Sequence, residues 1–280
     1  MSRAILVLGA TGNTGSAVVD APERFPDIAL RTATRRHTAP TRHEHRRFDW
    51  AAPATWAAAV EGMERMYLVA PVGDPDPMTT VGPFLEQAAE AGIERVVTLG
   101  SSAVATGDPG LGEIAAAVRD TFGEWEILRP SWYMQNFTGS HPVAESIRGT
   151  GEFVTATGIG RLPFIDARDI GRVAAHLLTA SRARCAEHLL TGPEALTYDE
   201  AAAIVSAMTG RAVRHRAVAR DRFVDALVGA GYDEAFADVL AALDILVRDG
   251  AQSVVSDTVE RITGTPPRSF ADYLTAAVRA

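Results

Sequence analysis

Lysine is missing from this 280-residue sequence, so all 27 basic residues are arginines. The absence excludes every mechanism that depends on a lysine amine. Cysteine occurs once, at Cys185, and a single thiol excludes an internal disulfide and a cysteine-rich metal site. One cysteine also fits a reducing compartment, so we expect a cytoplasmic protein.

Long apolar runs and an excess of positive charge are missing as well. No stretch approaches the ~20 apolar residues of a membrane span. The short apolar start runs directly into glycines, which is unlike a signal peptide. The net charge of −8 argues against general nucleic-acid binding, which needs a basic surface. We therefore expect a monomer or homodimer that binds a small molecule, with no nucleic acid and no membrane as partner.

Short β-rich runs alternate with alanine-rich helical stretches through the first half of the chain. Because strands and helices alternate across short connections, the pattern predicts an α/β fold with a doubly wound parallel Rossmann sheet. The expected strands are 4–10, 28–35, 45–50, 65–72, 95–104 and 124–131. The expected helices follow the first strand and span 54–63, 79–93 and 112–122.

The alternation loosens after residue 135. The sequence predicts a loop leading into a helix over 161–179, a last strand over 187–192, and helices over 197–210, 221–230 and 233–248. We therefore expect a cofactor-binding Rossmann core over 1–135. Residues 136–280 would form a smaller, mainly helical substrate lobe, packed on the core with some strands returning to the sheet.

Gly9, Gly12 and Gly15 occupy the turn between the first strand and the first helix. Gly9 permits the tight turn, Gly12 lets the backbone approach a pyrophosphate, and Gly15 lets the helix pack on the strand. The free N–H groups of the helix start would bind the phosphates. The alternative is a tight turn in a nucleotide-free protein, but the strand–turn–helix context favours the cradle. Three side chains of the turn add donors: Thr11, Asn13 and Thr14.

The end of the second strand distinguishes NAD from NADP. An NAD site has Asp or Glu there to bind the ribose hydroxyls, whereas this strand ends in Arg35 and Arg36. The nearest acid, Asp27, precedes the strand and so lies at the wrong edge of the sheet. Two guanidinium groups suit a 2′-phosphate, so the sequence predicts NADP(H) as cofactor. A solvated turn is a better description of Arg46 and Arg47.

Seven stretches, in order along nearly the whole chain, resemble the NmrA-like group of atypical short-chain dehydrogenases/reductases. Within that group the resemblance is strongest to NAD(P)H-binding reductases similar to festuclavine dehydrogenase and to azoreductases. The stretches are GATGNTG (9–15), YLVAPV (67–72), EAGIERVVTLGSSAV (90–104), LRPSWYMQNF (128–137), FIDARDIGRVAAHLL (164–178), LTGPEALTYDEAAAIVS (190–206) and TGTPPRSFADY (263–273).

The resemblance implies a cofactor site built from the ends of successive strands, with a substrate pocket beyond it. The implied residues are Gly9, Thr11, Gly12, Asn13, Thr14 and Gly15 at the pyrophosphate, Arg35 at the 2′-phosphate, Asp49 and Trp50 beside the adenine, Val69, Ala70 and Pro71 at the ribose, and Gly100, Ser101 and Ser102 on the nicotinamide side. The implied substrate residues are Trp132, Tyr133, Asn136 and Phe137.

The sequence departs from the wider superfamily at the proton-transfer residues. Ordinary members use a Tyr-x-x-x-Lys pair, and some relatives use a lysine on the helix equivalent to 112–122. Neither arrangement exists in a chain without lysine, and the polar residues of this helix are only Glu113, Arg119, Asp120 and Thr121. The remaining candidates for catalysis are Ser101, Ser102 and Tyr133.

Other patterns have a functional and a structural interpretation. The His43-Glu44-His45 run lacks supporting metal ligands and favours a solvated approach to a strand. Asp166 and Asp169 favour helix capping or arginine pairing over catalysis. No G-x-S-x-G elbow surrounds the two serines, which excludes a serine hydrolase. The residues after the strand over 124–131 either line a flat substrate pocket or belong to the core, and the sequence leaves both interpretations open. They are three aromatic residues and one methionine: Trp132, Tyr133, Phe137 and Met134.

The first functional hypothesis is an NADPH-dependent reductase of a small conjugated substrate, namely a quinone, an iminium or a polyketide-derived aromatic of secondary metabolism. Hydride transfer to an iminium needs no proton donor, and a quinone takes its proton from water, Tyr133 or a serine. The second hypothesis is an NADP(H) sensor without turnover, which the missing Tyr-x-x-x-Lys pair favours. The third is a non-redox reaction, such as isomerisation or coupling, with the nucleotide in a structural role.

Overall fold

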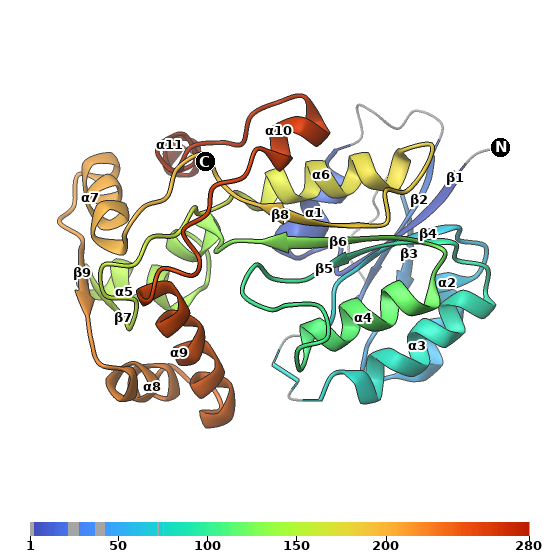
Figure 1. Ribbon diagram of the computed structural model, residues 1–280, viewed down its shortest axis with the longest axis horizontal. Helices are drawn as coiled ribbons and strands as arrows, with labels where there is room; N and C mark the ends of the chain where they lie inside the picture. The colour runs from blue at the N-terminus through green and yellow to red at the C-terminus, as the bar shows by residue number, and fades with distance from the viewer. Residues whose placement is uncertain (1–2, 22–27, 37–42, 72, 75, 280) are drawn as a thin grey trace. The chain divides into compact units, whose positions relative to one another are not determined.

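Seven strands form one sheet in the computed structural model, which describes residues 3–21, 28–36, 43–71, 73–74 and 76–279 (Figure 1). The strand order is β3-β2-β1-β4-β5-β6-β8, and every neighbouring pair from β3 to β6 is parallel. The predicted doubly wound Rossmann sheet is therefore confirmed. Its strands are β1 (Arg3–Leu8), β2 (Ile28–Thr34), β3 (Glu44–Arg47), β4 (Arg65–Leu68), β5 (Arg95–Leu99), β6 (Glu124–Pro130) and β8 (Ala186–Leu190).

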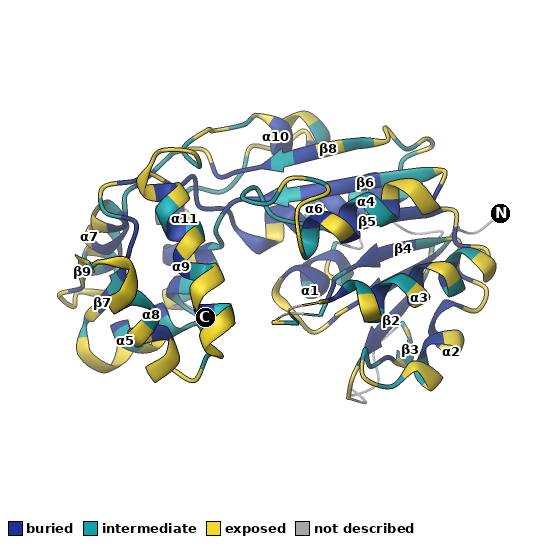
Figure 2. Ribbon diagram, turned by 60° about the horizontal axis from the view of Figure 1, so that its bottom comes forward, coloured by how far each residue is buried: buried dark blue, intermediate teal, exposed yellow. Residues whose placement is uncertain are grey.

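Helices cover both faces of this sheet, because its strands are apolar on both sides. On one face α2 (Trp56–Val60), α3 (Met78–Glu90) and α4 (Leu111–Thr121) share a buried apolar cluster with β1, β4 and β5 (Figure 1). On the other face α1 (Asn13–Val19) packs against α6 (Ala167–Thr179). Figure 2 shows the strands buried and the outer faces of these helices exposed. No helix of the described residues has the length and apolar character needed to cross a membrane.

The chain divides into two compact units. Unit 1 comprises Met1–Pro130 and Ala167–Leu189, and unit 2 comprises Ser131–Asp166 and Leu190–Ala280. In unit 2 a parallel pair, β7 (Glu152–Thr155) and β9 (Arg214–Ala217), is a structure that the sequence analysis did not predict. The helices of unit 2 are η3 (Met134–Phe137), α5 (Pro142–Thr150), α7 (Tyr198–Thr209), α8 (Arg220–Gly229), α9 (Glu234–Arg248), α10 (Thr258–Thr263) and α11 (Phe270–Arg279).

The strand predicted over 95–104 is shorter in the structure and ends at Leu99. The Gly100 N–H still donates to the Leu128 carbonyl at 2.8 Å, as a strand would. Beyond it, an arginine of β6 binds the carbonyls of Ser101 and Ser102, so these groups are not available to a strand ladder. The serines therefore lie in a loop that is anchored to β6.

Arg95, at the start of β5, connects two strands and the end of a helix. It lies opposite Glu124 of β6 in the strand register, and its Nε donates to the Glu124 carboxylate at 2.8 Å. Its Nη1 donates to the carbonyls of Leu177 and Ala180 at 2.9 and 2.7 Å, at the C-terminal end of α6. Burial raises the pKa of Glu124, but the Arg95 hydrogen bond and charge outweigh it, and the net pKa is lowered.

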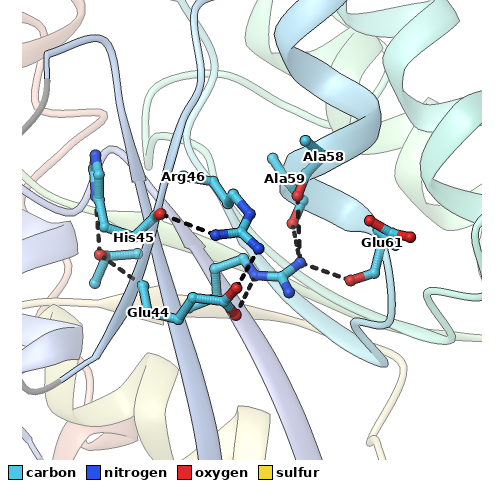
Figure 3. A network of polar contacts seen from close by, with 8 residues as sticks. Glu44, His45, Arg46, Ala58, Ala59 and Glu61 are labelled. Atoms are coloured by element: carbon cyan, nitrogen blue, oxygen red, sulfur yellow. Dashed lines mark hydrogen bonds and ion pairs between the residues drawn. The ribbon is translucent and has the colours of Figure 1, made fainter.

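Arg31 of β2 repeats this arrangement with Glu44 of β3. The two residues are register partners, and the Arg31 Nε donates to the Glu44 carboxylate at 2.8 Å. The Arg31 Nη1 donates to the carbonyls of Ala59 and Glu61 at 3.0 and 2.6 Å, at the end of α2 (Figure 3). The hydrogen bond from Arg31 lowers the pKa of Glu44. A positive charge at a helix C-terminus also interacts favourably with the helix dipole.

Replacing Arg95 with methionine tests this arrangement. Arg95→Met removes the Arg95 donor from the Leu177 carbonyl, leaves the Ala180 carbonyl with Arg65 as donor, and takes the strand partner from Glu124. We therefore expect the free energy of unfolding to fall by about 3 kcal/mol. Urea unfolding at neutral pH measures it. Arg119→Met is the matched control, because Arg119 forms only a surface ion pair with Asp120 and its loss should cost under about 0.5 kcal/mol. Equal losses in both variants would contradict the role of Arg95.

One buried acid of unit 2 has no cation paired with it among the described residues. Asp244 of α9 is 5% exposed, and its Oδ2 accepts the Ala156 N–H at 2.8 Å. Burial raises the pKa of Asp244 from 3.8 to about 7, and the Ala156 bond opposes this rise. Between these two pH values the folded protein holds a proton that the unfolded chain releases. The contribution of Asp244 to stability is therefore largest below pH 3.8 and falls as the pH rises toward 7.

Asp244→Asn removes this titration, while an amide oxygen still accepts the Ala156 N–H. We expect the stability of the variant, relative to the wild type, to improve by roughly 4 kcal/mol between pH 4 and pH 8. Thermal or urea unfolding across this range measures the difference. Asp249→Asn is the control, because Asp249 ends the same helix but is exposed and paired with Arg248. A pH profile that does not differ between wild type and Asp244→Asn is the result that contradicts this assignment.

Candidate functional site

The predicted cofactor residues of unit 1 lie at one edge of the sheet. Gly9 directly follows β1, Arg35 follows β2, Val69 follows β4, Gly100 follows β5, and Asp49 comes two residues after β3. Because these strands are parallel neighbours, their carboxyl ends meet at the same edge. β1 lies between β2 and β4, which is the point where the strand order reverses. Ligands of open α/β sheets bind outside the carboxyl ends at such a point.

The glycine loop is held in a tight turn. Gly9 has a φ of 63°, and its carbonyl accepts the Gly12 N–H at 2.8 Å. A Cβ at Gly15 would lie only 2.2 Å from the Gly9 carbonyl oxygen, so no other residue fits there. Thr11 and Asn13 are exposed, and the first turn of α1 contains no acid. The loop therefore presents an open helix start that suits an anion.

Thr14 differs from the other polar residues of the loop, because its side chain is 5% exposed. It lies beside Tyr67 of β4, whose phenol is fully buried. Burial raises the pKa of Tyr67, and the Thr14 side chain acts in the opposite direction. The Thr14 side chain therefore faces the interior under the loop. The group that Thr14 presents to a ligand is its backbone N–H.

The arginines near the end of β2 and β3 divide into two pairs. Arg46 contacts the Glu44 carboxylate at 2.5 Å, and Arg47 lies 3.9 Å from the carboxylate of Asp49. The side chains of Arg35 and Arg36 are exposed and make no ion pair or hydrogen bond within the part of the chain that the structure describes. Two guanidinium groups are therefore available at this edge. Asp27 lies outside the described residues.

An apolar wall continues the same edge. Trp50 packs edge-on against Phe48, Trp56 and Phe84, with ring centroids 4.9, 6.2 and 5.1 Å away. Val69 lies next to the glycine loop, 3.7 Å from the position of a Cβ at Gly9. After it, Ala70 is buried and Pro71 is half-buried. The structure thus brings the predicted adenine and ribose residues to the edge that carries the glycine loop.

The loop after β5 is tied to β6 by a second set of contacts. The Ser102 N–H donates to the Pro130 carbonyl at 2.9 Å, and the Ser101 Oγ accepts the Ala103 N–H at 3.2 Å. Arg129 of β6 donates through Nε to the Ser101 carbonyl at 3.3 Å and through Nη2 to the Ser102 carbonyl at 3.1 Å. No role for Arg129 follows from the sequence pattern alone. The signal that points to it is a charged residue near the end of a buried strand.

The predicted substrate residues belong to unit 2. Phe137 is 4% exposed and packs with Phe153, Phe164 and Phe270. Of the two interpretations that the sequence left open, substrate pocket or core, its side chain therefore belongs to the core. Met134 is likewise fully buried. Three others remain partly exposed in the segment after β6: Trp132, Tyr133 and Asn136.

Three patterns with a structural interpretation form ion pairs or polar contacts. Asp166 lies 2.9 Å from Arg268, and Asp169 pairs with Arg172. In the His43-Glu44-His45 run, Glu44 binds arginines and the His45 Nδ1 lies 3.2 Å from the Thr32 Oγ1 (Figure 3). Across the described ranges no three acidic, histidine or cysteine side chains gather as a metal site.

A groove of about 370 Å³ lies in unit 2 between the β7–β9 pair and α8. Its guanidinium groups are paired, Arg216 with Glu152 at 3.0 Å and Arg222 with Asp225 at 3.9 Å. The lining residues are Val154, Arg216, Val218, Arg222 and Ala226.

Known proteins match the chain along its whole length. It is 39% identical to the uncharacterized oxidoreductase YesF of Bacillus subtilis, over 97% of this chain and 94% of that protein. It is 34% identical to the agroclavine dehydrogenase of Claviceps fusiformis, over 96% of each. It is 32% identical to the NAD(P)H azoreductase of Xenophilus azovorans, over 99% of this chain and 98% of that protein.

A solved structure and a family profile agree with these matches. The triphenylmethane reductase of Citrobacter sp., crystallised with NADP(H), shares the fold with a TM-score of 0.82 at 23% identity, over 98% of this chain and 99% of that one. Residues 116–265, more than half of the chain, match the profile of the NmrA-like family. The protein therefore belongs to the NmrA-like family.

Proposed function

We propose that this protein is an NADPH-dependent reductase that transfers hydride to a small, flat, conjugated acceptor. The acceptor classes are a quinone, an iminium or a polyketide-derived aromatic of secondary metabolism. The observation that carries the proposal is the glycine cradle on the same sheet edge as Arg35 and Arg36, whose guanidinium groups have no partner among the described residues. The relatives named as an NAD(P)H azoreductase and an agroclavine dehydrogenase support it. A cytoplasmic location fits the single cysteine.

The residues of unit 1 fit the cofactor group by group. The N–H groups of Asn13, Thr14 and Gly15 open helix α1 and would bind the pyrophosphate, because the first N–H groups of a helix have no partner within it. Arg35 and Arg36 would bind the 2′-phosphate through charged hydrogen bonds. Asp49 and Trp50 would border the adenine, and Val69, Ala70 and Pro71 the ribose. Gly100, Ser101 and Ser102 would border the nicotinamide.

When bound, the nicotinamide supplies a hydride, which is two electrons and one hydrogen nucleus. An iminium carbon needs nothing more, whereas a quinone also takes up one proton to become the hydroquinone. We propose Ser101 and Ser102 as hydroxyl donors that stabilise the charge on such an acceptor, and water as the final proton source. Tyr133 is a further proposed donor, and Trp132 and Asn136 are proposed substrate contacts; these three rest on the sequence. Without lysine, catalysis would depend mainly on positioning.

The cofactor assignment predicts a selective loss of NADPH affinity. In Arg35→Ala/Arg36→Ala the 2′-phosphate loses its charged donors, so we expect the NADPH Kd to rise at least about tenfold. The NADH Kd should change less than twofold, since NADH lacks this phosphate. Cofactor fluorescence titration measures both constants. The control is Arg46→Ala, an arginine of the neighbouring strand that is paired with Glu44. An equal loss for NADH and NADPH contradicts the assignment.

The reductase assignment predicts turnover with label transfer. Wild-type protein with deuterated NADPH, carrying the label at nicotinamide C4, is offered a panel of quinones, cyclic iminium ions and azo compounds. We expect NADPH oxidation at 340 nm with at least one acceptor and deuterium in its reduced product. Tight NADPH binding with no oxidation by any acceptor overturns the reductase. That result leaves the NADP(H) sensor, which the absence of the Tyr-x-x-x-Lys pair favours, or a non-redox enzyme.

A further inference from the structure

We propose that Arg129 is a positioning residue for this reaction, which holds the loop after β5 so that the Ser101 hydroxyl is left as a hydrogen-bond donor. The inference rests on the proposed function. The geometry that carries it is one guanidinium group bound to two successive carbonyls, from Nε to Ser101 at 3.3 Å and from Nη2 to Ser102 at 3.1 Å.

A planar guanidinium constrains the two peptide groups together. Its donors diverge in a fixed fork, so binding both carbonyls sets the orientation of one peptide plane relative to the next. A lysine ammonium carries the same charge but has no such fork. The Gly100 and Ser102 N–H groups donate to the carbonyls of Leu128 and Pro130, also of β6, at 2.8 and 2.9 Å. Strand β6 therefore holds both N–H and carbonyl groups of the backbone from Gly100 to Ser102.

These contacts determine what the Ser101 side chain has to offer. A hydroxyl has one hydrogen to donate and accepts through its oxygen. The Ser101 Oγ already accepts the Ala103 N–H at 3.2 Å, and the adjacent loop carbonyls are engaged by Arg129. Among the described residues no carbonyl accepts the Ser101 hydroxyl. It is available to the oxygen or nitrogen of an acceptor on which negative charge develops.

Arg129 is itself anchored at its outer side. Its Nη1 donates to the Glu187 carboxylate of β8 at 3.0 Å, and the other Glu187 oxygen accepts the Thr106 hydroxyl at 2.7 Å. We call Arg129 and Glu187 together the clamp. The clamp joins β6 and β8 to both ends of the loop from 101 to 106. Arg129 and Glu187 are each about a third exposed, so neither charge is fully desolvated.

A double-mutant cycle tests the proposal. Arg129→Lys and Ser101→Ala are each expected to lower kcat for a quinone acceptor about tenfold, with the NADPH Kd within about twofold of wild type. The double variant should be no slower than Ser101→Ala, because Arg129 acts through the Ser101 hydroxyl. If the two losses multiply in the double variant, Arg129 has only a structural role and the proposal is overturned.

Amide hydrogen exchange measures the clamp without turnover. In Arg129→Lys the Ser102 and Ala103 N–H groups should exchange about tenfold faster, while the strands β1 and β4 keep their protection. Unchanged exchange overturns the clamp even where the kinetics fall. Arg222→Lys is the matched control, because Arg222 is an exposed arginine of α8 that pairs with Asp225, and its replacement should alter neither exchange nor kcat.

Two further results separate the possible failures. A wild type that oxidises no NADPH with any acceptor overturns the proposed function, whereas a loss that multiplies in an active enzyme overturns only the role of Arg129. If Arg129→Lys does not unfold cooperatively, Glu187→Gln replaces it in the cycle. That variant keeps both carbonyl contacts but loosens their anchor, so a smaller, non-additive loss of kcat is expected. An additive loss again contradicts the proposal.

Discussion

The candidate site depends on the parallel register of six neighbouring strands. Because β3, β2, β1, β4, β5 and β6 run in one direction, their carboxyl ends and the loops that follow lie at the same edge. The first of these loops closes only with glycine at position 15, since the Gly9 carbonyl oxygen occupies the space of a Cβ. This close contact sets the start of α1 against β1. The neighbouring strands then place the Arg35 and Arg36 side chains, the apolar wall around Trp50 and the loop after β5.

Arginine replaces lysine throughout this chain, and the sheet uses a property that lysine does not have. Arg31, Arg95 and Arg129 each lie on a strand, bind a carboxylate of the next strand, and donate to at least two backbone carbonyls. A divergent fork makes these contacts possible at once. In two cases the carbonyls end a helix, and the result is stability. In the third they belong to the loop that carries Ser101, where we propose that the same geometry positions a hydroxyl for the reaction.

The missing lysine changes the kind of catalysis that the fold can perform. A tyrosine activated by lysine lets ordinary members of the superfamily transfer a proton along with the hydride. In this chain the corresponding helix offers no such group. An acceptor that is already electron-poor, such as a quinone or an iminium, has the least need of a strong acid. The composition of the chain and the proposed substrate classes are therefore consistent with each other.

The sequence by itself determined the fold class, the place of the glycine loop after β1 and the place of two arginines after β2. Each of these depends on a local pattern. A short apolar run followed by spaced glycines specifies strand, turn and helix within fifteen residues of chain. It did not predict the β7–β9 pair, since Arg214–Ala217 is short and has no apolar alternation. It also left the role of Phe137 open and gave Arg129 none. Only the tertiary structure decided these, because which side chain is buried and which carbonyl meets a guanidinium depend on segments far apart in the chain.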